Sequence, residues 1–247
     1  MEPLERRNLL AIFTVNSASD AGDGDSDDGV CDTGNASDGF TGVCTLRAAT
    51  ITANHVAGLD RIHFSIPGPG IPTINVTTAA NQFRTLTDPI VIDGTTQPAG
   101  MVEINGSAAR DGFLFEVESS GSEVRGLIMN RFPETAIVLR ANNALIAGNY
   151  FGTDSTGTIT DPDEIPDNGD ELGNGAAVHI VVRLENDDVL GGKNNTIGGT
   201  SAADRNVISG NATGVAIFSP ANAGNRVLGN FIGTDVSGTQ GISYGRG

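Results

Sequence analysis

A short motif that occurs twice decides the fold of this chain. GNYFGTD at positions 148–154 returns as GNFIGTD at positions 229–235. The dipeptide Gly157-Thr158 returns at the same displacement as Gly238-Thr239. A repeat built of short strands, with Gly and Asn between them, predicts an all-β solenoid of the parallel β-helix type.

Four asparagines mark a shorter period inside this repeat. The interval from Asn130 to Asn149 equals the interval from Asn211 to Asn230, and each asparagine closes a short apolar strand. This interval is close to the roughly 20 residues of the shortest solenoid repeats, so we expect it to form one coil. We expect the four asparagines to be a structural ladder, because an amide side chain can bond its counterpart one coil along, while its backbone tolerates the bend. The Leu-x-x-Leu-x-Leu pattern of leucine-rich repeats is absent, and propeller blades are longer units.

Other segments extend the solenoid pattern in both directions. Alternation and turn residues predict further strands at 61–66, 71–76, 90–92, 136–139, 176–181, 207–209 and 214–218. Ile197-Gly198-Gly199-Thr200 is a third, shorter copy of the repeated loop.

The composition fits short strands joined by many turns. Gly accounts for 34 of the 247 residues, and the formal net charge is −16. Such a charge repels phosphate backbones, so we do not expect nucleic acid as a partner, and cations are the favoured small ligands. No stretch approaches the roughly 18 apolar residues that a membrane span needs.

An acidic run precedes the first cysteine. Asp23, Asp25 and Asp27 alternate with other residues as at the opening of a calcium-binding loop, and Asp28 follows. The sixth loop position is Asp28 rather than Gly, and the twelfth is Gly34 rather than Glu, so the EF-hand pattern fails at two defining places. Two interpretations stay open, a calcium site on these four aspartates or a solvated acidic turn.

The two cysteines, Cys31 and Cys44, enclose a loop rich in Gly, Asp, Asn and Ser. A disulfide between them would be worth roughly 3 kcal/mol and implies an oxidising compartment. Directly after Cys44, residues 45–54 carry apolar side chains at helical spacing, which predicts a helix. The bridged loop and this helix are well placed to cap the first coil of the solenoid.

Several motifs carry a resemblance to a known family. Cys44-Thr45-Leu46-Arg47-Ala48-Ala49-Thr50 is similar to the Cys-Ser-Leu-Arg-Glu-Ala-Ile motif that names the CSLREAI domain, with Thr for Ser, Ala48 for Glu and Thr50 for Ile. The Phe-x-Ile-Pro-Gly stretch at 64–68 and Ile-Asp-Gly-Thr-Thr-Gln-Pro at 92–98 follow the same family. Leu4-Glu5-Arg6-Arg7-Asn8-Leu9-Leu10 resembles the LEPR-XLL segment of large exported bacterial proteins, with Arg6 in place of proline.

The resemblance implies a right-handed parallel β-helix of the pectin-lyase type in a bacterial extracellular or cell-surface protein. It divides the chain into a targeting-like segment (1–12), a CSLREAI-like cap (13–58) and β-helix coils (59–247), which we expect to continue in a longer protein. No standard signal peptide is recognised at the N-terminus.

The sequence favours a non-catalytic role. We expect a structural, adhesion or carbohydrate-contact module, whose repeated Thr, Asn and Asp would hold a polysaccharide or matrix polymer through avidity. The alternative is a polysaccharide lyase or glycoside hydrolase, which needs paired carboxylates or a basic residue beside calcium. The densest acidic cluster, at 161–171, lies in an insertion after the first copy of the repeated loop.

Overall fold

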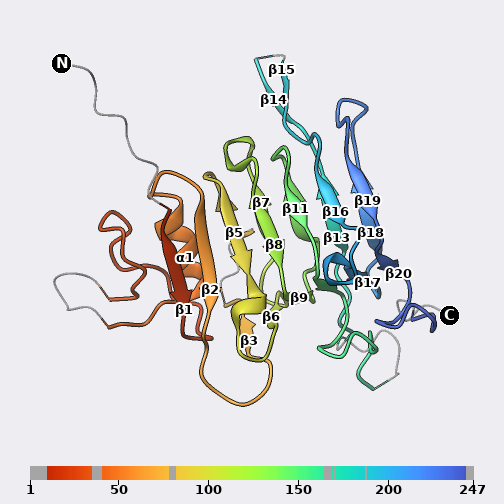
Figure 1. Ribbon diagram of the computed structural model, residues 1–247, viewed down its shortest axis with the longest axis horizontal. Coiled ribbons are helices and arrows are strands. Elements are labelled where there is room, and N and C mark those ends of the chain that lie inside the picture. Colours follow the sequence, from red (N-terminus) through yellow and green to blue (C-terminus); the bar gives the residue numbers. More distant parts are fainter. Residues whose placement is uncertain are drawn as a thin grey trace.

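The computed structural model describes residues 10–34, 41–77, 82–163, 169, 171–186 and 188–242. Most of the regular structure is strand, arranged in parallel sheets that we call A, B and C. Figure 1 shows the strands following one another along the long axis of the molecule in chain order. This arrangement is compatible with the all-β parallel solenoid that the sequence predicts.

Each sheet takes one strand from successive passes of the chain. Sheet A contains β1 (Ile12–Val15), β2 (Asp60–Phe64), β5 (Ile90–Asp93), β8 (Glu123–Arg125), β11 (Leu145–Ile146), β16 (Thr196–Gly198) and β19 (Arg226–Leu228). Sheet B contains β3 (Thr73–Asn75), β6 (Val102–Asn105), β9 (Leu127–Asn130), β12 (Tyr150–Phe151), β17 (Val207–Ile208) and β20 (Phe231–Ile232). Sheet C contains β4 (Gln82–Leu86), β7 (Asp111–Phe115), β10 (Thr135–Leu139), β13 (Ala176–Ile180) and β18 (Thr213–Ile217).

From β2 onward the chain visits sheets A, B and C in that repeating order, and each strand pairs in parallel with its counterpart from the next pass. One such pass is called a coil below. An antiparallel hairpin of β14 (Arg183–Glu185) and β15 (Asp188–Leu190) interrupts the order between β13 and β16. Short 3-10 helices occur at η1 (Gly94–Thr96), η2 (Val117–Ser119) and η3 (Ala202–Asp204).

The core lies between the sheets and is built of stacked rows of apolar side chains. In sheet A, one row occupies the same register in five successive strands, and all its members are fully buried. The row comprises Ile62, Ile92, Val124, Ile146 and Ile197. Because like side chains stack on like, each coil removes the apolar surface of its neighbour from water.

The coils differ in length, so the expectation of one constant coil, equal to the interval from Asn130 to Asn149, is wrong. In sheet B, Met129 pairs with Phe151, and Phe151 pairs with Ile208, so a short coil is followed by a much longer one. Loops of different lengths connect the strands, and the register between neighbouring coils is kept. The two GN-x-x-GTD copies lie in sheet B at β12 and β20, with β17 between them. The third copy lies in sheet A at β16, so it does not occupy an equivalent place.

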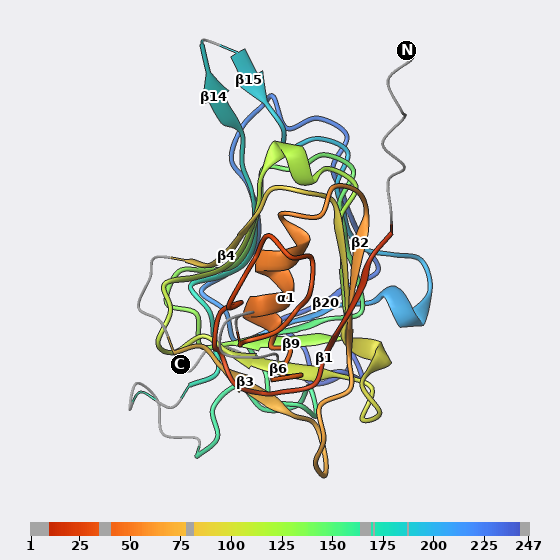
Figure 2. The same cartoon turned by 90° about the vertical axis from the view of Figure 1, so that its left-hand side faces the viewer.

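The cap helix forms where the sequence predicts it. α1 (Leu46–Ala53) starts after Thr45, whose hydroxyl accepts the Ala48 N–H at 3.0 Å, and ends at Asn54. Leu46 and Ala49 are fully buried in the core, and Figure 2 shows α1 lying across the end of the sheets. Within the described residues, no helix is both long and apolar enough to cross a membrane.

Several elements were not expected from the sequence, among them the strands β4, β6, β7 and β8, the first strand β1 and the β14–β15 hairpin. β1 belongs to the region assigned to the cap, yet it pairs in parallel with β2 and begins sheet A. The β14–β15 hairpin projects beyond the sheets (Figures 1 and 2). Arg183 anchors it through ion pairs with Glu118, at 2.8 Å, and with Glu116, at 3.6 Å.

Candidate functional site

The predicted disulfide is confirmed. Cys31 and Cys44 are bonded, and the loop that they close is further held by Asp32. The Asp32 carboxylate accepts hydrogen bonds from the Thr41 hydroxyl at 2.7 Å and from the Gly34 N–H at 2.7 Å. The Thr41 hydrogen bond is the main cause that lowers the pKa of Asp32 to about 2.

Aspartate carboxylates of the acidic run accept hydrogen bonds from backbone N–H groups two residues further along the chain. Asp23 accepts the N–H of Asp25 at 3.1 Å, Asp25 that of Asp27 at 3.3 Å, and Asp28 that of Val30 at 2.7 Å. These are Asx turns, in which a carboxylate closes a bend two residues on. Across the described residues, no three His, Cys, Asp or Glu side chains converge in a way that could hold a metal ion. Calcium binding by the four aspartates remains a prediction.

The CSLREAI-like segment has a structural task at the cap. Arg47 forms an ion pair with Asp20 at 2.8 Å, and its Nε donates to the Asp20 carbonyl at 3.1 Å. The buried Asp20 carboxylate also accepts the Thr77 N–H at 2.8 Å. This cluster ties the start of α1 to the segment after β3. The LEPR-XLL-like segment at 4–10 lies outside the described residues except for Leu10.

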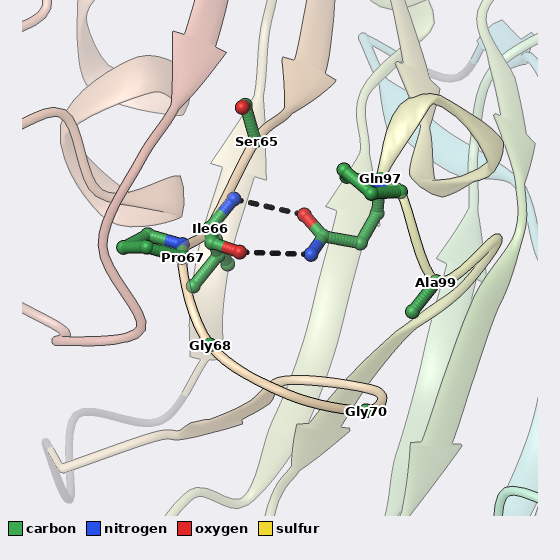
Figure 3. A pocket seen from close by; sticks show the side chains of 8 residues that line it. Ser65, Ile66, Pro67, Gly68, Gly70, Gln97 and Ala99 are labelled. Atoms are coloured by element: carbon green, nitrogen blue, oxygen red, sulfur yellow. Dashed lines mark hydrogen bonds between the residues drawn. The ribbon is translucent and has the colours of Figure 1, made fainter.

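The other two family-like segments contact one another. Gln97 clamps the backbone of Ile66, accepting its N–H at 2.8 Å and donating to its carbonyl at 2.9 Å (Figure 3). The Thr96 hydroxyl accepts the Phe64 N–H at 2.8 Å. Beside this clamp is an open pocket of about 480 Å³, lined by Ser65, Ile66, Pro67, Gly68, Gly70, Gln97, Pro98 and Ala99. The residues that line it are uncharged, and the hydrogen bonds of Gln97 and Thr96 fix the position of one coil against the next.

Asparagine ladders exist, but their membership differs from the expected one. Asn149 donates its N–H to Asn206 Oδ1 at 2.9 Å, and the Asn206 amide donates to Asn230 Oδ1 at 2.9 Å. Asn149 and Asn230 therefore share one ladder, with Asn206 between them. Asn211 belongs to a second ladder, where it accepts the Asn174 amide at 2.7 Å.

Asn130 is not in either ladder. It lies in register with Asn105 of sheet B, and its amide donates to Glu103 Oε1 at 2.8 Å. In a further ladder, the Asn195 N–H donates to Asn225 Oδ1 at 2.8 Å. A constant spacing cannot find the other ladder members, because the coils that connect them have different lengths. Those members are Asn75, Asn105, Asn174, Asn195, Asn206 and Asn225.

The repeated loops form stacked polar turns, here called the GTD turns (152–159 and 233–240). Val236 donates its N–H to the Gly157 carbonyl at 2.9 Å, so the two turns lie against one another. In the first, the Asp154 carboxylate accepts the Thr158 N–H at 3.1 Å; in the second, a hydrogen bond from Ser237 lowers the pKa of Asp235. Thr156, Thr158, Ser237 and Thr239 are exposed residues, and their hydroxyls pair within each turn, Thr156 with Thr158 and Ser237 with Thr239.

A second polar site, which we call the sheet C cluster, was not expected from the sequence. It combines Arg110, Asp111, Glu134, Thr135, His179 and Phe218, contributed by β7, β10, β13 and β18 or the residues next to them. Arg110 binds Glu134 with Nε–Oε1 at 2.7 Å and Nη2–Oε2 at 2.9 Å. Asp111 accepts the Thr135 N–H at 3.1 Å, and the Thr135 hydroxyl lies 3.1 Å from His179 Nδ1. The rings of His179 and Phe218 meet edge to face at 4.9 Å.

The ionisable groups of the sheet C cluster act on one another. Burial raises the pKa of the Asp111 carboxyl, and the Glu134 charge adds to that shift. The Arg110 hydrogen bond lowers the pKa of Glu134. Burial also lowers the pKa of His179, which favours a neutral imidazole near pH 7 that can both donate and accept.

The acidic insertion is only partly described. Asp161 accepts the Asp163 N–H at 3.3 Å, whereas Glu164, Asp167 and Asp170 lie outside the described residues. Comparison of the chain with protein-family models, with curated proteins and with solved structures finds no match.

Proposed function

We propose that this chain is a right-handed parallel β-helix module of an exported or cell-surface bacterial protein, with a CSLREAI-like cap. Its role is structural, adhesive or carbohydrate-contacting, and it is non-catalytic in this chain. The repeating visits to three parallel sheets support the solenoid, and crossovers between parallel strands are right-handed in about 98% of cases. The Cys31–Cys44 disulfide supports an oxidising compartment.

The observation that carries this proposal is the pair of stacked GTD turns. Each turn uses its aspartate to fix its own backbone and one hydroxyl, so its exposed Thr and Ser side chains are held in place. The backbone hydrogen bond between Val236 and Gly157 sets the two rows of hydroxyls side by side. A polymer with repeated hydroxyls could engage several such positions together, and avidity would multiply weak contacts.

The test is a glycan-array screen of the soluble chain, run with calcium and with chelator. Binding without cleavage supports the display module. Loss of binding in chelator would implicate the acidic run, where calcium would use the carboxylates of Asp23, Asp25, Asp27 and Asp28. Failure to bind any glycan would remove the carbohydrate role and leave a structural one, for which the disulfide-bonded cap and the solenoid suffice.

A glycoside hydrolase is the second candidate, favoured by one feature of the sheet C cluster. Neighbouring carboxyl groups whose pKa values shift in opposite directions are a recurrent arrangement for an acid and its partner base. The pKa of Asp111 is raised and the pKa of Glu134 is lowered in this way. A reducing-end assay on each bound polysaccharide decides between the two functions: release of reducing ends, abolished by Asp111→Asn, would overturn the non-catalytic proposal.

A further inference from the structure

We propose that the outer face of sheet C carries a binding subsite for an uncharged saccharide, with the Phe218 ring as its stacking platform. The inference rests on the carbohydrate-contact role proposed above, and gives it a site and a class of sugar.

Phe218 is an unusual side chain for an exposed position. It is 63% exposed and is the one aromatic among the exposed large apolar side chains of the described residues. His179 meets its ring edge to face at 4.9 Å, which fixes the ring orientation. The C–H face of a pyranose placed on this ring would remove apolar surface of both partners from water.

The strands beside Phe218 form a continuous floor. His179 pairs with Val138 on one side and with Ala216 on the other, and Val138 pairs with Leu114. Side chains alternate along a strand, so Phe218, two residues after Ala216, shares the face of His179. The floor from β7 to β18 crosses three strand spacings, about 14 Å in all, which suits an extended oligosaccharide.

Polar groups line the end of this floor where the strands begin. Arg110 and Glu134 are exposed there, and Asp111 is half-buried beside them. A carboxylate accepts from two neighbouring hydroxyls and a guanidinium donates to them, which is the pattern that sugar diols require. The neutral imidazole of His179 adds a donor or acceptor between the ring and these groups.

The charges of the sheet C cluster and of the whole chain indicate which class of sugar can bind. The guanidinium of Arg110 is already paired with Glu134, and the carboxyl group of Asp111 forms no ion pair with any residue that the structure describes. The whole chain carries a net charge of −16. A uronate polymer would meet like charge at the site and at long range, so the structure assigns an uncharged saccharide.

The test is calorimetric titration of the disulfide-bonded chain with cellohexaose, xylohexaose and mannohexaose, with hexagalacturonate as the anionic counterpart. We expect a neutral hexasaccharide to bind. Phe218→Ala should weaken that binding about tenfold or more, because it removes the buried ring, whereas Phe218→Tyr should keep it. Leu184→Ala is the matched control, because Leu184 is 73% exposed and belongs to the β14–β15 hairpin rather than to sheet C.

Three results would overturn the subsite. They are unchanged binding by Phe218→Ala, tighter binding of hexagalacturonate than of the neutral sugars, and an equal loss with Leu184→Ala. If binding survives Phe218→Ala but is lost in Thr156→Val with Ser237→Ala, the subsite fails while the proposed function stands at the GTD turns. If the wild-type chain binds none of these sugars and no glycan on the array, both carbohydrate proposals fail together.

Discussion

Asp60 is a buried carboxylate with one oxygen satisfied and one not. Its Oδ1 accepts the Ala11 N–H at 2.9 Å, whereas its Oδ2 has no hydrogen-bond partner among the described residues. Burial raises the pKa of Asp60, and the charge of Asp88 adds to that shift. The folded state therefore holds the proton more tightly than the unfolded chain does. The stability that protonation contributes is present below the unfolded pKa of 3.8 and is lost as the pH rises through the folded value.

Asp60→Asn should therefore raise the thermal midpoint at pH 7, because it removes an ionised group that burial disfavours and keeps an oxygen for Ala11. The gain should shrink as the pH falls through the raised pKa of the wild-type carboxyl, which then takes up its proton. Thermal unfolding across this range measures the effect. Asp188→Asn changes net charge equally at an exposed position and is the control. A gain that is independent of pH, or equal in both variants, would contradict the explanation.

Asn206 is the middle residue of its ladder and is fully buried. It accepts the Asn149 N–H and donates to the carbonyl of Ile146 at 2.8 Å. Asn206→Ala should cost about 3 kcal/mol of unfolding free energy, because both groups lose their partner in a dry interior. Asn230→Ala, at the half-buried end of the same ladder, should cost about 1 kcal/mol. Urea unfolding of both variants tests this, and equal losses would show that the ladder position does not matter.

At the scale of the element, the contribution of the Thr45 hydroxyl to the N-cap of α1 can be tested. This hydroxyl accepts the Ala48 N–H at 3.0 Å and donates to the Ala21 carbonyl at 2.6 Å. Thr45→Val keeps the shape and removes both bonds, so we expect a loss of about 2 kcal/mol. Thr45→Ser keeps both bonds, and should lose less than about 1 kcal/mol for the missing methyl group. If chemical denaturation shows that Thr45→Ser is less stable than Thr45→Val, the capping role is refuted.

The helix and several strands could be predicted from the sequence, whereas the lengths of the coils could not. The strands at 136–139 and 176–181 and the helix at 45–54 follow from local alternation and helical spacing, and the structure has β10, β13 and α1 there. The coil length does not follow, because loops leave the solenoid without changing the register inside it. For the same reason the sheet C cluster was missed: Thr135 and His179 meet at 3.1 Å although they lie in different strands, far apart in the sequence.

At the scale of the whole molecule, the two ends of the solenoid differ. α1 covers one end, where it contacts β1, β2 and β4. At the other end, β18, β19 and β20 are the last strands of their sheets, and each has one edge that pairs with no other strand of the described residues. Inward-facing residues there are 41–53% exposed, although the residues that pair with them one coil earlier are buried. The pairs are Ile180 with Ile217, Ile197 with Val227, and Ile208 with Ile232.

This open end should make the chain self-associate. Exposed edges and apolar core favour a further layer of strands, and because α1 blocks the opposite end, two copies would meet end to end and stop as a dimer. A net charge of −16 on each copy opposes the contact, so salt should strengthen it. Light scattering after size exclusion should show a mass that rises with concentration and with salt. Val227→Lys with Ile232→Lys should restore the monomer, whereas Leu184→Lys on the hairpin should not. A wild-type chain that stays monomeric in high salt would mean that strand edges and about half-exposed side chains at this end are tolerated in water without a partner.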